Sequence, residues 1–535
     1  DKDDKKDEDK KKDKKDKDIT IDFTGIENRQ VTLPIDAGRY GGMRAIEDKL
    51  FYYSSGFGGL SGRMGEQRTD LHVFDMEKRE DNVFLKDIRG YDISADGKKL
   101  LYRKGDNFGI IDAGGKSGNA SEGGLKLGEM VMYLDRDAEY QQMFKEAWRL
   151  QRDFFYDPNM HGVDWPAIYD RYAALVPYAA HRFDLTYIIA EMIGELSCSH
   201  TYTGGGDRIV PEASGIGLLG VDWAIDSANG RYQIGRILRG QNWVNNRRSP
   251  LTEPDINIAE GDYVLKINGQ DLVAVDNPYR LLTKQMGKTV TLTVNDKPSL
   301  DGAREVTVEP IASEIGLRYY SWVEDNRRYV DSVTNGRIGY IHIPDMGGTG
   351  LNEFVRTFYP QLDKEALIID ERGNGGGFVS QLILERLRRE LVGMRAPRNW
   401  DVNPVPSRVF IGPLVCLANQ YSCSDGDNFP YYFKKYGLGP VIGKRTWGGV
   451  VGMRGHRRLT DGGYVRTPEF STYNLDREWV MENYGVEPDI EVDNLPQRVI
   501  AGYDDQLIKA IEVLNEKLAE QKIELPERPD TPEER

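Results

Sequence analysis

One serine lies where the chain is expected to pass from a strand into a helix. Ser424 follows the apolar run 414–418 and the turn residues 419–423, and it precedes a helix-like run, 428–436, that stops at Gly437. N–H groups in the first turn of a helix have no backbone partner, so they can stabilise an oxyanion beside a nucleophilic hydroxyl. A serine here can also be an ordinary helix N-cap. This pattern alone leaves both roles open.

A nucleophilic serine needs a base whose pKa lies near neutrality, and histidine is the usual choice. The chain has six histidines, and His200 follows Ser199 at the end of a helical pattern, in a small and polar context. A single histidine is more often a surface or satisfied core residue, and a glutamate such as Glu482 is normally solvated. His200 and Glu482 are therefore candidates only in combination with the serine.

A glycine-rich turn, 375–377, follows an apolar strand pattern at 366–370. Glycine lets the backbone approach a ligand closely and aim an N–H inward. The turn matches neither of the common glycine-rich nucleotide-binding patterns, G-x-G-x-x-G and G-x-x-x-x-G-K-[ST]. The chain has no H-E-x-x-H, and its three cysteines have no zinc-ligand spacing. We expect no metal and no cofactor.

Residues 313–521 alternate strand and helix patterns, which predicts a βαβ arrangement with catalytic groups at the carboxyl ends of parallel strands. The expected elements are strands at 337–343, 366–370 and 414–418, and helices at 352–362, from the glycine turn to about 391, and at 504–521. Residues 522–535 are expected to form a C-terminal tail.

The N-terminal third has a different character. Residues 1–18 contain nine acidic and nine basic residues and nothing else, so we expect a charged disordered linker. Residues 19–130 carry short alternating strands with Asp-Gly turns, which predict the terminal blades of an incomplete β-propeller. Because a closed propeller needs four to eight blades, the native chain is expected to extend N-terminally.

Two further domains are expected before the α/β region. Residues 131–212 should form a helical domain that carries Ser199 and His200. Its first helix should have most of its apolar residues on one face, namely Tyr140, Met143, Phe144, Ala147, Trp148, Phe154 and Phe155. Residues 213–312 should form a small β domain. Its loop 217–220 and its hairpin 261–269 resemble a PDZ domain, in which loop N–H groups hold a peptide carboxylate. The proposed loop residues are Gly217, Leu218, Leu219 and Gly220. The alternative is a β domain that only spaces its neighbours.

The composition excludes several classes of function. A net charge of −15, spread along the chain, argues against nucleic-acid binding. No apolar run approaches the ~18 residues needed to span a membrane. Three unpaired cysteines suit a reducing cytoplasm. The chain begins with Asp1, so a periplasmic location, directed by a signal peptide outside this sequence, is the alternative.

Together these motifs resemble the tricorn-type proteases of the S41 serine peptidases. The resemblance covers nearly the whole chain from about residue 19. It implies a multidomain α+β fold with partial β-propeller blades, a helical domain, a PDZ-like domain and a crotonase- or ClpP-like α/β catalytic domain. The motifs are S-H at 199–200, D-x-R-x-N-G-G-G at 370–377, S-D-G-D at 424–427, G-K-R-T-W-G-G-V-V-G at 443–452 and E-N-Y-G-V-x-P-D at 482–489.

The resemblance implies roles for individual residues. Ser424 would be the nucleophile and His200 the general base, with Ser199 and Glu482 completing a Ser–His–Ser–Glu tetrad. Members of the same clan with a Ser–Lys dyad place the lysine where this chain has Gly449, which has no side chain to act as a base. The resemblance therefore favours histidine.

It also implies the groups around the scissile bond. Gly377 and Asp425 would donate backbone N–H groups to an oxyanion hole, and Gly376 would contact the substrate. An acidic residue that selects basic P1 side chains in tricorn-type proteases corresponds here to Arg395. We therefore expect a weakened preference for basic P1 residues, in favour of acidic or apolar ones. A shifted alignment would instead bring in Asp401 and restore the basic preference.

The expected function is an ATP-independent serine endopeptidase that degrades short peptides or protein fragments. Its partners would be peptide substrates and further copies of the chain, since the resemblance implies a homo-oligomer in the form of a hexameric ring. The alternative is a non-catalytic scaffold whose PDZ and propeller units bind peptides. A serine-reactive fluorophosphonate separates the two, because only an enzyme is labelled at Ser424.

Overall fold

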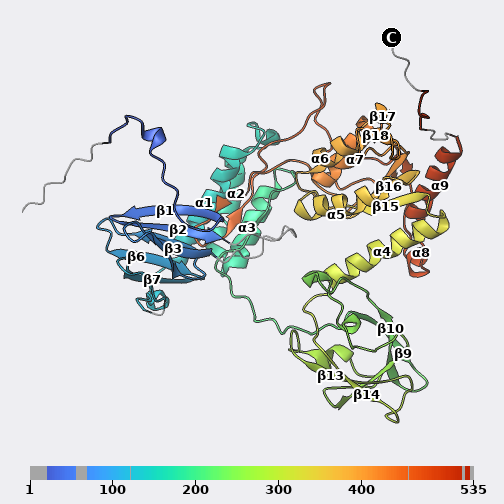
Figure 1. The fold of residues 1–535 in the computed structure, drawn as a ribbon, viewed down its shortest axis with the longest axis horizontal. Coiled ribbons are helices and arrows are strands. Elements are labelled where there is room, and N and C mark those ends of the chain that lie inside the picture. Colours follow the sequence, from blue (N-terminus) through green and yellow to red (C-terminus); the bar gives the residue numbers. More distant parts are fainter. Residues whose placement is uncertain (1–20, 56–68, 121, 456, 521–524, 531–535) are drawn as a thin grey trace, which may run out of the picture. The chain divides into compact units, whose positions relative to one another are not determined.

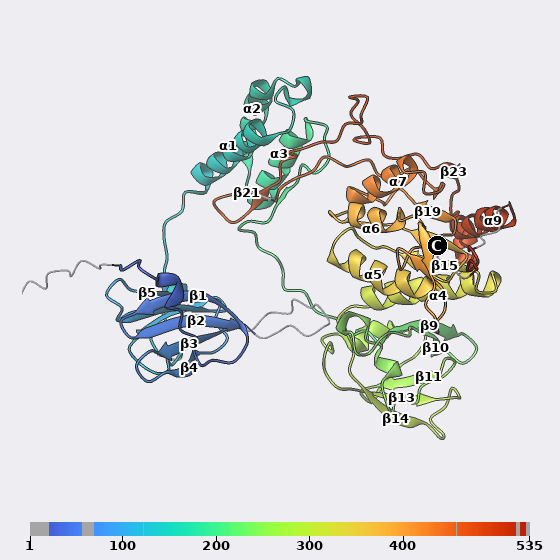
Figure 2. The same cartoon turned by 45° about the horizontal axis from the view of Figure 1, so that its top comes forward.

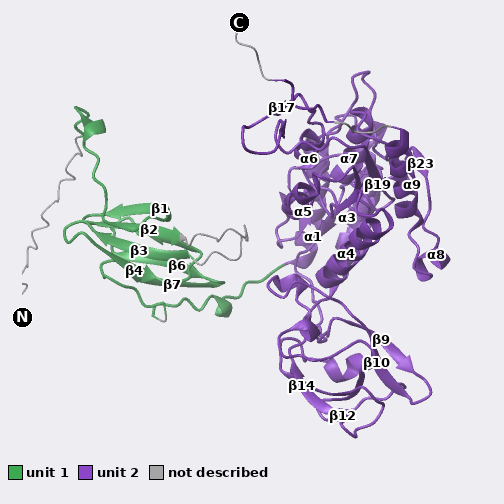
Figure 3. Cartoon of the chain, turned by 45° about the vertical axis from the view of Figure 1, so that its right-hand side comes forward, with its two compact units in different colours: residues 1–134 green, residues 135–535 purple. Residues whose placement is uncertain are grey.

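The computed structural model describes residues 21–55, 69–120, 122–455, 457–520 and 525–530. The chain divides into two compact units, residues 1–134 and 135–535 (Figure 3). Within the described residues, no helix has the length and apolar character needed to cross a bilayer. In the same residues, no group of three or more His, Cys, Asp or Glu side chains is placed to hold a metal ion.

The first unit consists of two antiparallel sheets in which each strand pairs with the next along the chain. Alternating side chains pack inward, as on β6, where Leu100 and Tyr102 are buried. The predicted propeller blades stay a prediction. The four-stranded sheet contains β1 (Arg39–Ile46), β2 (Lys49–Ser55), β3 (Thr69–Asp75) and β4 (Glu80–Leu85), and the three-stranded sheet contains β5 (Gly90–Ile93), β6 (Lys99–Lys104) and β7 (Asn107–Asp112).

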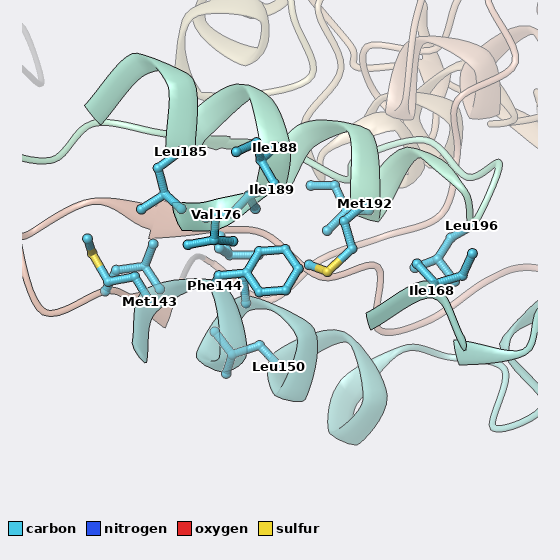
Figure 4. Close-up of a cluster of buried hydrophobic side chains, with 14 of the residues drawn as sticks. Met143, Phe144, Leu150, Ile168, Val176, Leu185, Ile188, Ile189, Met192 and Leu196 are labelled. Atoms are coloured by element: carbon cyan, nitrogen blue, oxygen red, sulfur yellow. The ribbon is translucent and has the colours of Figure 1, made fainter. Parts of the chain in front are cut away.

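The second unit opens with three helices, α1 (Arg136–Phe154), α2 (Trp165–Ala173) and α3 (Arg182–Gly194). Asp135 caps α1 by accepting a hydrogen bond from the N–H of Ala138. Apolar side chains of α1 and α3 meet between the helices (Figure 4). The predicted inward face of α1 is buried at Tyr140, Met143, Phe144 and Ala147. Phe154 was expected on that face but is exposed, since Phe155 takes the buried position at the helix end.

The β domain that follows is a sheet of order β14-β13-β11-β10-β9, with the short β12 paired to β11. Its core includes Val264, Ile267, Leu292 and Val294. The strands are β9 (Val221–Asp226), β10 (Arg231–Ile237), β11 (Tyr263–Ile267), β12 (Gln270–Asp271), β13 (Val290–Asn295) and β14 (Arg304–Val308).

A parallel sheet forms the centre of the C-terminal region, and Figure 1 labels its strands β15 and β16. The sheet has five strands in the order β15-β16-β19-β20-β23. Its three central strands are buried on both faces, which explains their continuous apolar sequences. The strands are β15 (Ile338–His342), β16 (Ala366–Asp370), β19 (Leu414–Ala418), β20 (Val441–Gly443) and β23 (Ile490–Glu491).

Helices cover both faces of this sheet. One face packs against α5 (Gly348–Phe358), α6 (Ser380–Leu387) and α7 (Asp425–Lys435). The other packs against α4 (Ile315–Val333) and α9 (Asp505–Glu520). A short helix, α8 (Pro496–Ile500), precedes α9, and the strands β17 (Gly393–Arg395) and β18 (Asn403–Val405) pair with each other outside the sheet.

A small sheet joins the helical segment to the C-terminal region (Figure 2). In it, β8 (Thr203–Gly204) pairs with β22 (Tyr464–Val465), and β22 pairs with β21 (Arg457–Arg458). The ion pair between Arg182 Nε and Asp461 Oδ2, at 2.5 Å, is almost fully buried beside it. The sheet fixes the chain immediately after His200.

Candidate active site

Ser424 occupies the turn between β19 and α7, as the sequence predicts. It takes the N-cap position, but its side chain does not cap the helix, and its hydroxyl has no hydrogen-bond partner among the described residues. Its φ of 59° and ψ of −117° are unfavourable for a residue with a Cβ, at a cost of roughly 1–3 kcal/mol. The turn therefore holds a free hydroxyl in a strained conformation, which is typical of functional sites.

Two N–H groups beside this hydroxyl are free. Within the described residues, neither the N–H of Gly377 nor that of Asp425 donates a backbone or side-chain hydrogen bond. Gly376 approaches the serine so closely that a Cβ there would lie 2.6 Å from Ser424 Cβ. Only glycine fits this contact, so the turn residues 375–377 and the serine turn form one surface.

Asn374 ties the two turns together. Its Oδ1 accepts from the N–H of Gly376 at 2.9 Å, and its carbonyl oxygen accepts from the N–H of Cys423 at 2.9 Å. Its Nδ2 donates to the carbonyl of Ile343 at 2.9 Å, at the end of β15. One buried amide thus connects the glycine turn, the residue before Ser424 and the edge of the sheet.

The carboxylate of Asp425 fixes the residue whose N–H is free. Asp425 Oδ2 accepts from the N–H of Ser380 at 3.0 Å, and Oδ1 accepts from the Ser380 hydroxyl at 2.6 Å. Ser380 begins α6, so the carboxylate also lies at the positive end of that helix. The family resemblance implied only a backbone role for Asp425, and the contact of its side chain with Ser380 was not predicted.

Ser199, His200 and Glu482 lie in direct contact. Ser199 Oγ donates to Glu482 Oε2 at 3.0 Å and lies 3.0 Å from His200 Nδ1. The N–H of Ser199 donates to Glu482 Oε1 at 2.7 Å. Glu482 Oε2 also accepts from the N–H groups of Val450 and Val451, at 2.8 and 3.0 Å. Four donors thus orient a carboxylate that the sequence marked only by its motif.

The His200 ring lies among aromatic side chains, with the Tyr202 ring 5.8 Å and the Trp447 ring 6.3 Å from it, centroid to centroid. The N–H of Trp447 donates to the carbonyl of Ser422 at 3.0 Å, which connects this side of the site to the serine turn. No hydrogen bond joins Ser424 and His200 within the described residues. In enzymes without substrate such contacts often form only in the complex.

Burial lowers the pKa of His200, and the charge of Arg466 lowers it further, while the charge of Glu482 raises it. The imidazole is therefore neutral at neutral pH. Its backbone has a φ of 61°, and Met481 and Asn483, on either side of Glu482, have φ values of 70° and 61°. Strained backbone thus occurs at both halves of the candidate site.

The carboxylate of Asp427 holds the loop 446–449, a role that was not predicted from the sequence. Asp427 Oδ1 accepts from the Thr446 hydroxyl and, at 2.7 Å, from the N–H of Gly448, while Oδ2 accepts from the N–H of Gly449 at 3.3 Å. A Cβ at Gly449 would lie 2.1 Å from the Trp447 ring. Lys444 is ion-paired with Glu491 at 2.9 Å, which raises the pKa of its amine and makes it a poor base.

The PDZ-like loop has acceptors within the chain. The N–H of Gly217 donates to Leu282, and the N–H of Leu218 donates to Ile311, each at 2.9 Å. The N–H of Gly220 donates to the buried Glu314 carboxylate at 2.8 Å. These three N–H groups are therefore not free to bind a peptide carboxylate. At Gly220, a peptide carboxylate would have to displace the carboxylate of Glu314. Leu219 is buried in the domain core.

Arg395 is exposed on the hairpin of β17 and β18, and so is Asp401. Neither contacts Ser424, His200 or Glu482 within the described residues. The structure therefore brings Ser199, His200 and Glu482 into direct contact. It also places the turn that carries Ser424 against the glycine turn with Gly376 and Gly377. It gives the P1 prediction no direct support.

Comparison with known proteins agrees with this organisation. Residues 337–492 match the model of peptidase family S41, residues 136–194 match the tricorn protease C1 domain, and residues 217–313 match the tricorn protease PDZ domain. A putative tricorn-like protease C-terminal subunit of Sulfurisphaera tokodaii is 36% identical over 510 residues, which cover 94% of this chain and 58% of that protein. The tricorn protease of Thermoplasma acidophilum is 34% identical, with 95% and 47% covered. A crystal structure of the tricorn protease superimposes with a TM-score of 0.81 at 33% identity, covering 91% of this chain and 47% of that one.

The fold and the matched domains identify the chain as a member of peptidase family S41. Within that family the chain belongs to the tricorn type, with its C1 and PDZ domains. It spans about half the length of the curated relatives that it matches. The predicted family and the multidomain α+β fold are confirmed.

Proposed function

We propose that the chain hydrolyses peptide bonds through an acyl-enzyme, with Ser424 as nucleophile and His200 as general base. The observation that carries this proposal is the contact series from Glu482 through Ser199 to His200 Nδ1. A strained serine with a free hydroxyl and two free N–H groups complements it. Ser199 and Glu482 act as positioning residues.

The hydrogen bonds assign the histidine tautomer. Glu482 Oε2 can only accept, so the Ser199 hydroxyl donates to it. The Ser199 oxygen then accepts from His200, whose Nδ1 carries the proton. Nε2 is left with a lone pair, as a general base requires. A charged Glu482 stabilises the imidazolium that forms when His200 takes the serine proton.

The reaction follows from these positions. Ser424 Oγ bonds to the substrate carbonyl carbon as its proton moves to His200 Nε2. The carbonyl oxygen becomes an oxyanion and accepts from the N–H groups of Gly377 and Asp425. Nε2 then returns the proton to the leaving amine nitrogen as the C–N bond breaks. Water, deprotonated by the same nitrogen, hydrolyses the ester and restores Ser424.

The substrates we propose are short peptides or protein fragments, cut internally and without ATP. A homo-oligomer, which the family resemblance suggests is a hexamer, and a cytoplasmic location are further parts of the proposal. The three free cysteines support the location. The P1 preference stays a prediction, to be measured with fluorogenic peptides varied at P1. Fastest cleavage after Arg or Lys would contradict the weakened basic preference.

Turnover of internally quenched peptides by the intact chain tests the function. We expect Ser424→Ala and His200→Ala to lose turnover and to keep the folded state. Ser332→Ala is the matched control, because Ser332 is an exposed serine of α4. Turnover that survives Ser424→Ala would contradict the proposal. Peptide binding without turnover or serine labelling would favour the scaffold.

A further inference from the structure

The guanidinium of Arg466 and the imidazole of His200, the candidate general base, both lie near the Tyr202 ring. In the small sheet, Val465 pairs with Thr203, and the next residue, Arg466, donates its N–H to the carbonyl of Tyr202 at 2.7 Å. The guanidinium carbon of Arg466 is 5.8 Å from the centre of the Tyr202 ring, and that ring is 5.8 Å from the His200 ring. Strand pairing therefore fixes this cation beside the site.

Arg466 has no acid partner among the described residues, unlike several arginines around it. Arg454 and Arg457 both pair with Glu469, at 2.7 and 2.9 Å, and Arg445 approaches Glu487 at 3.8 Å. Among the described residues, no carboxylate pairs with Arg466, and the hydrogen bond of its side chain goes from Nη1 to the Met453 sulfur at 3.7 Å. Sulfur is a weak acceptor.

The Nε–H of Arg466 is buried and has no hydrogen-bond partner in the described part of the chain. Leaving such a donor unpaired is unfavourable, and a carboxylate offers the matching planar pair of acceptors. The nearby acid Glu482 already accepts from Ser199, Val450 and Val451. The unsatisfied guanidinium is thus left for a group from outside the chain.

We propose that Arg466 binds a carboxylate of the peptide substrate on the leaving-group side of the scissile bond, so that acidic peptides are preferred. The inference rests on the proposed function. His200 Nε2 must face the leaving amine, and the Tyr202–Arg466 pair lies beside that imidazole. The carboxylate comes from an Asp or Glu side chain or from the C-terminus of the peptide.

Arg466 should also affect the pH dependence of kcat. Arg466 contributes to the lowered pKa of His200, after burial. A bound carboxylate neutralises that contribution. In the enzyme–substrate complex, the acid limb of kcat is therefore expected at higher pH for an acidic peptide than for its neutral analogue. A purely structural role of Arg466 predicts no such difference between peptides.

The experiment compares peptide pairs that differ by one charge. Internally quenched peptides carry Glu or Gln at each position after the scissile bond, with a free or an amidated C-terminus. Wild type, Arg466→Gln, Arg466→Lys and Arg458→Gln are assayed as the intact chain. Arg458 is the control, since it is an exposed cation of the same sheet.

We expect wild type and Arg458→Gln to favour the acidic peptide at one position by about tenfold in kcat/KM, as for a charge-assisted hydrogen bond. Arg466→Gln should abolish this ratio, and Arg466→Lys should keep part of it. A ratio that depends instead on the free C-terminus identifies the terminal carboxylate as the ligand.

An unchanged ratio in Arg466→Gln, or an equal loss for acidic and neutral peptides, would overturn the inference. Fluorophosphonate labelling of Ser424 separates this outcome from failure of the proposed function. Labelling and turnover without a charge preference would refute only the role of Arg466. Absence of both from wild type would refute the function itself.

Discussion

Ser199 Oγ donates a hydrogen bond to Glu482 Oε2 at 3.0 Å, across 283 positions of the sequence. This contact joins the segment that follows α3 to the loop before β23. The small sheet of β8, β21 and β22 stabilises the same approach. The candidate site is therefore assembled from two regions of the chain, and neither contains all of its groups.

Glu482→Gln should reduce kcat strongly with little change in KM. The amide keeps the size of the side chain, but it cannot accept all four hydrogen bonds or stabilise an imidazolium. We expect a loss of about a hundredfold or more, the scale seen when a group that stabilises transition-state charge is removed. Steady-state kinetics measure both parameters.

Glu487→Gln is the matched control for this change, because Glu487 lies on the same loop and is exposed. It should retain the activity of the wild type. If both variants lose activity equally, the effect comes from the loop as a whole, and Glu482 has no specific positioning role.

The pH profile should report the lowered pKa of His200. A general base works only when neutral, so kcat/KM falls as the pH drops through its pKa. Burial lowers that pKa from its ordinary value of 6.5, which places the acid limb below pH 6.5. Because the charge of Glu482 raises the same pKa, residual activity of Glu482→Gln should have its acid limb at still lower pH. An acid limb of kcat/KM above pH 6.5 in the wild type would contradict a lowered pKa of His200.

Asp425 and Ser380 should show coupled effects on stability and rate. Ser380→Ala removes one donor of the carboxylate and is expected to lower the free energy of unfolding by about 1 kcal/mol. Asp425→Asn loses the charge at the start of α6 and shifts the N–H proposed for the oxyanion. A double-mutant cycle in urea unfolding should give a non-zero coupling energy. If the effects of the two substitutions on the free energy of unfolding simply add, the contact between Asp425 and Ser380 contributes little to stability.

Glu371 should destabilise the fold increasingly as the pH rises. Its carboxyl is fully buried, and neither oxygen has a hydrogen-bond partner among the described residues. Burial raises its pKa well above 4.5; the nearby Ser422 hydroxyl opposes this shift, and the charges of Asp427, Asp370 and Asp425 add to it. Above about pH 4.5 the unfolded chain releases this proton and the folded chain keeps it, so stability falls with rising pH.

Glu371→Met tests this expectation by replacing the carboxyl with an apolar chain of similar length. At pH 8 the variant should be more stable than the wild type by about 1–3 kcal/mol, and the difference should narrow toward pH 5. The exposed Glu385→Met serves as control. A difference that is the same at both pH values would show that Glu371 is not protonated in the folded state.

The fold class could be predicted because its signals are local. The continuous apolar runs of β16 and β19 identify strands buried on both faces, and the glycines at 375–377 mark a close backbone approach. The candidate tetrad residues were predicted from sequence motifs that resemble those of tricorn-type proteases. Their hydrogen bonds join residues hundreds of positions apart, which periodicity cannot reveal.

Other features could not be predicted from the sequence, for physical reasons. The internal acceptors of Gly217, Leu218 and Gly220 depend on tertiary packing, and so does the side-chain contact of Asp425. Glu371 lies in a turn motif, where an acidic residue is normally solvated, yet here it is buried. Phe154 and Phe155 could not be ranked, because a one-residue change at the helix end decides which ring faces inward.

Covalent labelling can identify the nucleophilic serine. The intact chain is treated with a fluorophosphonate, and the modified residue is located by peptide mass spectrometry. We expect one labelled serine, Ser424, and a steep fall of the labelling rate in His200→Ala. In the wild type, the rate should fall only below pH 6.5, where His200 with its lowered pKa becomes protonated. Labelling at another serine, or labelling of Ser424 that is independent of His200, would contradict the proposed roles of Ser424 and His200.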